Sequence, residues 1–84
     1  MAELARFYGL IIKMFFRQGE HSPPHFHVEY GESVGMIDIK TMEMIEGDLP
    51  KRALDMVKEW GELHKAELEE IWKTQKSSKL PPLD

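Results

Sequence analysis

Two short alternating segments separated by only two residues constrain the fold of this chain more than any other feature. Residues 25–30, HFHVEY, alternate polar and apolar side chains, and residues 33–39, SVGMIDI, form a second such run. Alternation with a period of two is typical of a half-buried β-strand, and a two-residue linker with glycine first, Gly31-Glu32, suits a type II′ turn. The sequence therefore predicts a β-hairpin.

The turn also predicts the register of the hairpin. Tyr30 pairs with Ser33, which places His25 directly opposite Asp38. Because successive side chains alternate across a sheet, one set of residues faces the core: Phe26, Val28, Tyr30, Ile37 and Ile39. The other set faces away from it: His25, His27, Glu29, Met36 and Asp38.

Further elements flank the hairpin on both sides. Residues 7–17, FYGLIIKMFFR, are rich in aromatic and β-branched side chains and predict one strand, and residues 42–45 predict a short fourth strand. The segment from Pro50 to about residue 75 has apolar residues at helical spacing and predicts one long helix, with a kink at Gly61 as an alternative. We therefore expect an α+β fold, a three- to four-stranded antiparallel meander packed on one face by a single long C-terminal helix. Residues 1–76 form this ββββα domain, and residues 77–84 form a loose tail.

Composition excludes several classes of protein. A chain of 84 residues has room for one small domain, and the absence of cysteine excludes disulfides, thiolate zinc sites and cysteine nucleophiles. The net charge of −4 disfavours binding to nucleic acid, although a local basic patch remains an alternative. The apolar N-terminal run is interrupted by Lys13, is shorter than the roughly 20 residues that span a bilayer, and lacks a signal-peptide cleavage site. We expect a cytoplasmic protein without membrane contact.

One helix can cover only one face of the predicted sheet. The opposite face then exposes a set of apolar side chains: Phe7, Ile11, Phe15 and Met36. Exposed apolar patches mark contact surfaces, so the sequence predicts an interface with a partner protein or with further copies of the chain. The alternative is that the C-terminal tail folds back and covers this face.

Three of the four histidines lie within seven residues of each other. His25, His27 and Asp38 share one side of the hairpin and could together hold zinc or iron(II), with His21 or Glu29 as an accessory proton carrier. A His25–Asp38 pair without metal is an alternative, and so is a His-x-His that is merely the polar half of a strand. His64 lies within the apolar stripe of the helix, so we expect a structural histidine bonded to a backbone carbonyl or to Tyr8.

Several segments together resemble a known family. RFYGLIIKMFF, the block H-x-PPHFHV-x-YG, the segment IDI and the block LPKRAL with EW and LH after it occur here in this order. This combination is similar to a small prokaryotic family named only as a domain of unknown function, DUF4160, over roughly residues 5–75. On this chain its signature residues would be Pro24, His25, Phe26, His27, Tyr30, Gly31, Pro50, Trp60 and His64. Gly61 stands where the family would be expected to have alanine.

The resemblance implies a genomic context and supplies no catalytic activity. Members look like single-domain bacterial proteins, often encoded beside another small domain in a layout similar to toxin–antitoxin gene pairs, and no established catalytic role comes with them. We therefore rank a protein-interaction component of such a two-gene module first and lean against an enzyme. A metal-dependent hydrolase or nuclease using His25, His27 and Asp38 is the alternative, and an RNA- or DNA-binding regulator is the second alternative.

Overall fold

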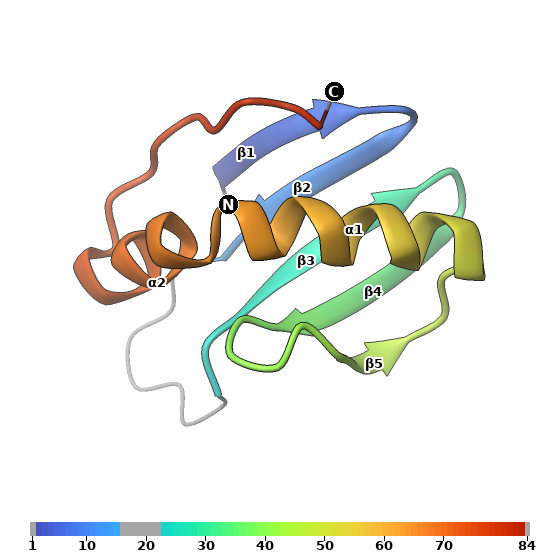
Figure 1. The fold of residues 1–84 in the computed structure, drawn as a ribbon, viewed down its shortest axis with the longest axis horizontal. Coiled ribbons are helices and arrows are strands. Elements are labelled where there is room, and N and C mark those ends of the chain that lie inside the picture. The colour runs from blue at the N-terminus through green and yellow to red at the C-terminus, as the bar shows by residue number, and fades with distance from the viewer. Residues whose placement is uncertain (1, 16–22, 84) are drawn as a thin grey trace.

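The computed structural model describes residues 2–15 and 23–83, which form one antiparallel sheet and two helices (Figure 1). The elements in chain order are β1 Ala2–Phe7, β2 Leu10–Met14, β3 His25–Tyr30, β4 Ser33–Asp38, β5 Met44–Gly47, α1 Lys51–Leu63 and α2 Lys65–Thr74. The strands follow each other across the sheet in the order β1-β2-β3-β4-β5. The α+β class and the antiparallel meander are confirmed. The strand number and the single helix are corrected to the five strands and two helices that the described residues form.

The additional strand comes from a hairpin at the N-terminus. Tyr8 and Gly9 both have positive φ, 48° and 82°, as a type I′ turn requires, and Phe7 pairs with Leu10 across it. The prediction of one continuous strand over residues 7–17 was therefore wrong at residues 7–9, where β1 ends and the chain turns, and correct over β2; residues 16 and 17 lie outside the described residues. The apolar residues on both sides of the Tyr-Gly pair read as one run because the turn itself carries an aromatic side chain.

The central hairpin has the predicted register. Tyr30 pairs with Ser33, Phe26 with Ile37 and His25 with Asp38, and Gly31 has the positive φ of 60° that a type II′ turn needs at its first position. Phe26, Val28 and Ile37 are fully buried, as the alternation predicts.

The core lies between the sheet and α1, which crosses one face of the sheet (Figure 1). Trp60 lies at its centre, fully buried, with ring centroids 5.8 Å from Phe7 and 6.0 Å from Phe26. Contacts of this kind stabilise by aromatic packing as well as by burial. None of the helices in residues 2–15 and 23–83 is long and apolar enough to span a membrane.

The helical segment breaks at His64, three residues beyond the expected kink. His64 has φ −116° and ψ 19°, and its backbone N–H donates to the carbonyl oxygens of Trp60 and Gly61. Gly61 itself serves packing, since an added Cβ there would lie 2.5 Å from Sδ of the buried Met42. α2 begins after this break at Lys65, and its Trp72 packs on His25 at the start of β3.

The C-terminal tail is anchored instead of loose. The Leu80 N–H donates to the Leu4 carbonyl at 2.8 Å, Leu80 is buried, and the Trp60 indole Nε1–H donates to the Pro81 carbonyl at 2.8 Å. The tail therefore runs along the outer edge of β1 on the side of Trp60 (Figure 1). These contacts correct the prediction of a loose tail, and they place the tail away from the face opposite α1.

Candidate functional site

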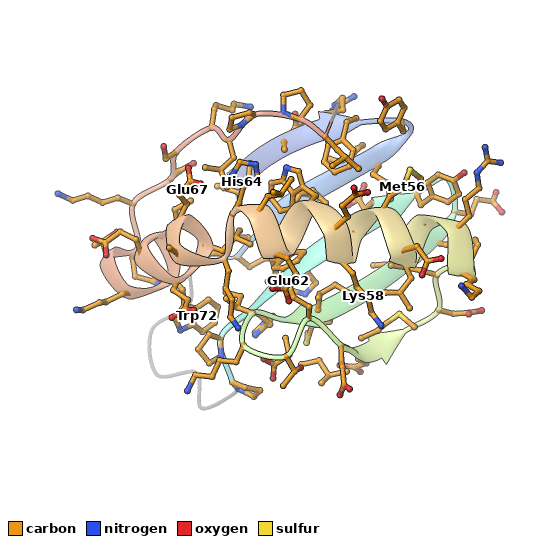
Figure 2. The ribbon with its side chains drawn as sticks, in the orientation of Figure 1. Met56, Lys58, Glu62, His64, Glu67 and Trp72 are labelled. Atoms are coloured by element: carbon orange, nitrogen blue, oxygen red, sulfur yellow. The ribbon has the colours of Figure 1, made fainter. Side chains whose placement is uncertain are left out.

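A row of four aromatic rings links the open face of the sheet to α2. Phe15 contacts His27, His27 contacts His25, and His25 contacts Trp72, with ring centroids 4.5, 5.2 and 5.0 Å apart. His25 and His27 come from β3, and Phe15 directly follows β2. Trp72 belongs to α2 (Figure 2). The predicted neighbourhood of the two histidines is thus present, and an aromatic side chain from the distant helix completes it.

His25 is held in a defined orientation. It is 2% exposed, and its Nδ1 lies 2.8 Å from the Pro23 carbonyl oxygen. A carbonyl oxygen only accepts hydrogen bonds, so Nδ1 donates to Pro23, and Nε2 is the ring nitrogen that Pro23 does not contact. The adjacent Pro24 carbonyl accepts the Ile39 N–H at 2.9 Å, which fixes the Pro-Pro segment to the end of β4.

Asp38 lies opposite His25, but its carboxylate has a structural task. Oδ1 accepts hydrogen bonds from the backbone N–H groups of Lys40 at 2.7 Å and Thr41 at 3.1 Å, and so stabilises the turn after β4. The structure gives His25 a hydrogen bond to Pro23 and describes no ion pair between His25 and Asp38. The orientation of His25 therefore comes from the diproline segment.

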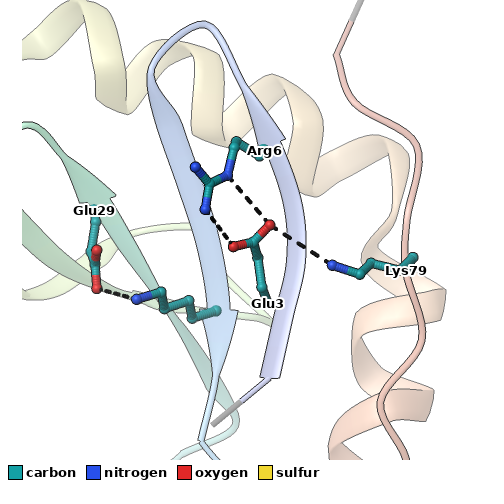
Figure 3. A network of polar contacts seen from close by, with 5 residues as sticks. Glu3, Arg6, Glu29 and Lys79 are labelled. Carbon is teal, nitrogen blue, oxygen red and sulfur yellow. Dashed lines mark hydrogen bonds and ion pairs between the residues drawn. The ribbon is translucent and has the colours of Figure 1, made fainter.

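The predicted metal ligands are His25, His27 and Asp38, with His21 or Glu29 as an accessory proton carrier. Within residues 2–15 and 23–83, no group of three or more His, Asp or Glu side chains is close enough to hold a metal ion. Glu29, the accessory candidate, forms a 2.7 Å ion pair with Lys13 (Figure 3), and His21 lies outside the described residues. His25 and His27 thus remain as an adjacent pair of imidazoles.

His64 occupies the break between the helices. Its side chain is 13% exposed, its ring lies 5.1 Å from that of Trp60, and its Nδ1 is 2.7 Å from Oε1 of Glu67 (Figure 2). The expected partners were a backbone carbonyl or Tyr8, and that expectation was wrong. Tyr8 is 60% exposed in the first turn, whereas Glu67 lies three residues after His64 in the first turn of α2.

The sheet face opposite α1 presents most of the predicted apolar set. Ile11, Phe15 and Met36 are half-buried there, and Val34, which the same alternation places on this face, is 51% exposed. Phe7 is 7% exposed and packs on Trp60, so its assignment to this face was wrong. The turn at Tyr8-Gly9 pairs Phe7 with the core residue Leu10, which turns its side chain inward.

Polar side chains divide this apolar set into two parts. The Lys13–Glu29 ion pair and His27 lie between the apolar residues of β2 and those of β4, because Ile11 pairs with Glu29 and Glu29 with Val34. A shallow hollow of about 280 Å³ extends from this face to β5, lined by His27, Val34, Gly35, Met36, Glu46 and Gly47. We call this surface, made of Ile11, Phe15, Val34 and Met36 around the ion pair, the open sheet face.

A second polar cluster lies at the edge strand β1. Arg6 and Lys79 both contact the Glu3 carboxylate, at 2.7 and 3.8 Å (Figure 3). The hydrogen bond from Arg6 lowers the pKa of Glu3, with further lowering from the charges of Arg6, Lys79 and Lys13, and Glu3 in turn raises the pKa of Arg6. This cluster helps to hold the tail against β1.

A groove of about 750 Å³ lies beside α2. Leu63, Ala66 and Trp72 line it together with Pro24, and Lys65 closes one side by donating to the Lys40 carbonyl at 2.7 Å. Sequence reasoning missed this groove because it exists only where the helix breaks at His64. Leu63 is 67% exposed beside it, an exposure that appears only in the folded structure.

Comparisons with known proteins give a family and no activity. The searches against curated proteins and against solved structures found no match. A family model described as a domain of unknown function, DUF4160, matches residues 9–73, which include the central hairpin, α1 and most of α2. The chain belongs to the DUF4160 family.

Proposed function

We propose that this protein is a protein-interaction component, and that a partner binds to its open sheet face. The supporting observation is that α1 and the tail pack on the side of Trp60, while Val34 is 51% exposed beside the half-buried Met36, Ile11 and Phe15. Protein interfaces have an apolar core, in which aromatic residues and methionine are enriched, and a polar rim. Phe15 and Met36 would belong to the core here, and the Lys13–Glu29 pair is already satisfied within the chain. The resemblance to two-gene modules makes the product of the neighbouring gene the first partner to test.

The test is co-expression with the neighbouring gene product, followed by size-exclusion chromatography with light scattering. Val34→Glu and Met36→Glu should each abolish the complex, because they put a charge into the centre of an apolar contact. Leu63→Glu is the matched control, since Leu63, at 67%, is more exposed than Val34 and lies in the helical groove. A protein that ignores its neighbour and stays monomeric contradicts the proposal, and so does equal loss with Leu63→Glu.

A metal-dependent hydrolase or nuclease is the second candidate. It is favoured by one observation, the 5.2 Å spacing of the His25 and His27 rings, with Nδ1 of His25 held by the Pro23 carbonyl. Metal analysis of untagged protein tests it first. Thermal unfolding with added zinc or iron(II) should then stabilise the native protein and not His27→Ala; no bound metal and no stabilisation reject this candidate.

Nucleic-acid binding ranks third. Arg6, Lys13 and Lys51 are each paired with an acid, namely Glu3, Glu29 and Asp55, so their charges are largely compensated. A fluorescence anisotropy titration with short RNA at low and moderate salt tests it, and an absence of salt-dependent binding ends it.

A further inference from the structure

The two edges of the sheet differ in whether another segment covers them. The outer edge of β1 is covered by the tail, through the Leu80 N–H bond to the Leu4 carbonyl and the contact of Lys79 with Glu3. β5 ends the sheet on the other side, and within the described part of the chain no strand pairs with its outer edge. A strand edge with unpaired N–H and C=O groups is a template on which another strand can form.

The edge of β5 is held in place. Gly47 has a φ of 100°, and a side chain there would collide with the Val34 carbonyl oxygen and the backbone of Gly35. The Asp48 N–H donates to that same Val34 carbonyl at 3.0 Å, and the Asp38 N–H donates to the Glu43 carbonyl at 2.9 Å. The strand is therefore fixed on β4 at both ends, so that a partner would meet a preformed edge.

The charges around this edge select its partner. Glu43, Glu46 and Asp48 are all exposed in or beside β5, and Ile45 between them is 46% exposed. A second copy of the chain would bring the same three carboxylates against them, so edge-to-edge self-association is opposed by like charges. A strand with lysine or arginine at alternate positions would be attracted instead.

We propose that the outer edge of β5 docks a basic, extended segment of a partner protein as a sixth strand. The inference rests on the proposed function in that the partner is a protein, but it uses the strand edge instead of the sheet face. Backbone hydrogen bonds to β5 would supply affinity, and alternate side chains would supply specificity. The hollow beside Glu46 and Met36 would accept one side chain of the docked segment. The exposed Ile45 would contact an apolar side chain of that segment.

The probe is a synthetic peptide of alternating lysine and valine, titrated into the isotope-labelled full chain and followed by NMR. The expected result is a shift of the amide signals of Met44–Gly47, slower hydrogen exchange there, and weaker binding as salt is added. A peptide with glutamate in place of lysine should not bind. A lysine–valine peptide with alternate N-methylated amides should lose binding, because it cannot form the ladder.

Two matched double variants separate the edge from overall charge. Glu43→Gln with Glu46→Gln should weaken binding by roughly tenfold, since an exposed ion pair contributes about threefold. Glu59→Gln with Glu62→Gln changes the net charge equally on exposed positions of α1 and should leave binding unchanged. Absence of shifts at Met44–Gly47, equal binding of the N-methylated peptide, or equal weakening by both variants overturns the inference.

The complex with the neighbouring gene product distinguishes a wrong assignment of the β5 edge from a wrong proposed function. If only the edge assignment is wrong, the complex with the neighbouring gene product still forms and is lost with Val34→Glu, while the β5 double variant leaves it intact. If the proposed function is wrong, that complex does not form at all.

Discussion

Replacing Leu80 by alanine tests whether the tail belongs to the folded domain. The Leu80 side chain is 9% exposed, and its N–H is bonded to the Leu4 carbonyl, so truncation removes buried apolar surface and leaves a cavity beside β1. Leucine-to-alanine changes in cores cost about 2–5 kcal/mol, and a site at the margin of the core, where the tail can settle inward, falls at the lower end. We expect a loss of about 2 kcal/mol in the free energy of unfolding.

For a domain of this size, a loss of about 2 kcal/mol lowers the melting temperature by roughly 8–16 °C. Thermal unfolding followed by circular dichroism measures it directly. Leu63→Ala is the matched control, because the same side chain is 67% exposed there and its removal should change stability by no more than about 0.5 kcal/mol. If the two variants melt within a few degrees of each other, the tail is not anchored and the reasoning is refuted.

The other predictions concern packing and pH. Gly61→Ala should destabilise the protein by about 1 kcal/mol despite the better helix propensity of alanine, because the added Cβ meets Met42 Sδ. In urea unfolding, the double variant with Met42→Ala should lose less stability than the sum of the two single losses, and additive losses would contradict this. The Glu3 carboxyl should titrate below its ordinary pKa, and Arg6→Ala should raise that pKa in a carbon-detected NMR titration; an unchanged value would contradict it. Because the folded-state pKa is lowered, this pair stabilises the protein above the unfolded-state pKa, and its contribution is lost as pH falls through the folded-state pKa.

The structure also changes how the histidines are understood. A His25–Asp38 pair was one of the alternatives, but the Pro23 carbonyl orients His25 and the Asp38 carboxylate stabilises a turn. A substitution of Asp38 should therefore disturb the turn after β4 more than the chemistry of His25. The two imidazoles and Trp72 remain together whichever function the partner and metal experiments support.

The sequence by itself determined the central hairpin. Its two strands are joined by two residues, so the turn fixed the register, and the register fixed which side chains face the core. Phe26 and Ile37 are buried, and His27 and Met36 lie on the opposite face, as the alternation requires. The register and the facing of these side chains depend on backbone geometry within about fifteen residues, so a local sequence pattern is sufficient to predict them.

Tertiary structure decided the rest. The turn at Tyr8-Gly9 was hidden because apolar residues continue on both sides of it, and only its pairing with β2 turns Phe7 toward Trp60. α1 ends where the backbone of His64 leaves helical geometry, and the tail is held by Leu4 and Trp60, which are far from it in the sequence. Local propensity leaves several conformations of these segments nearly equal in free energy, and contacts between distant segments determine which one forms. A short sequence pattern therefore does not predict them.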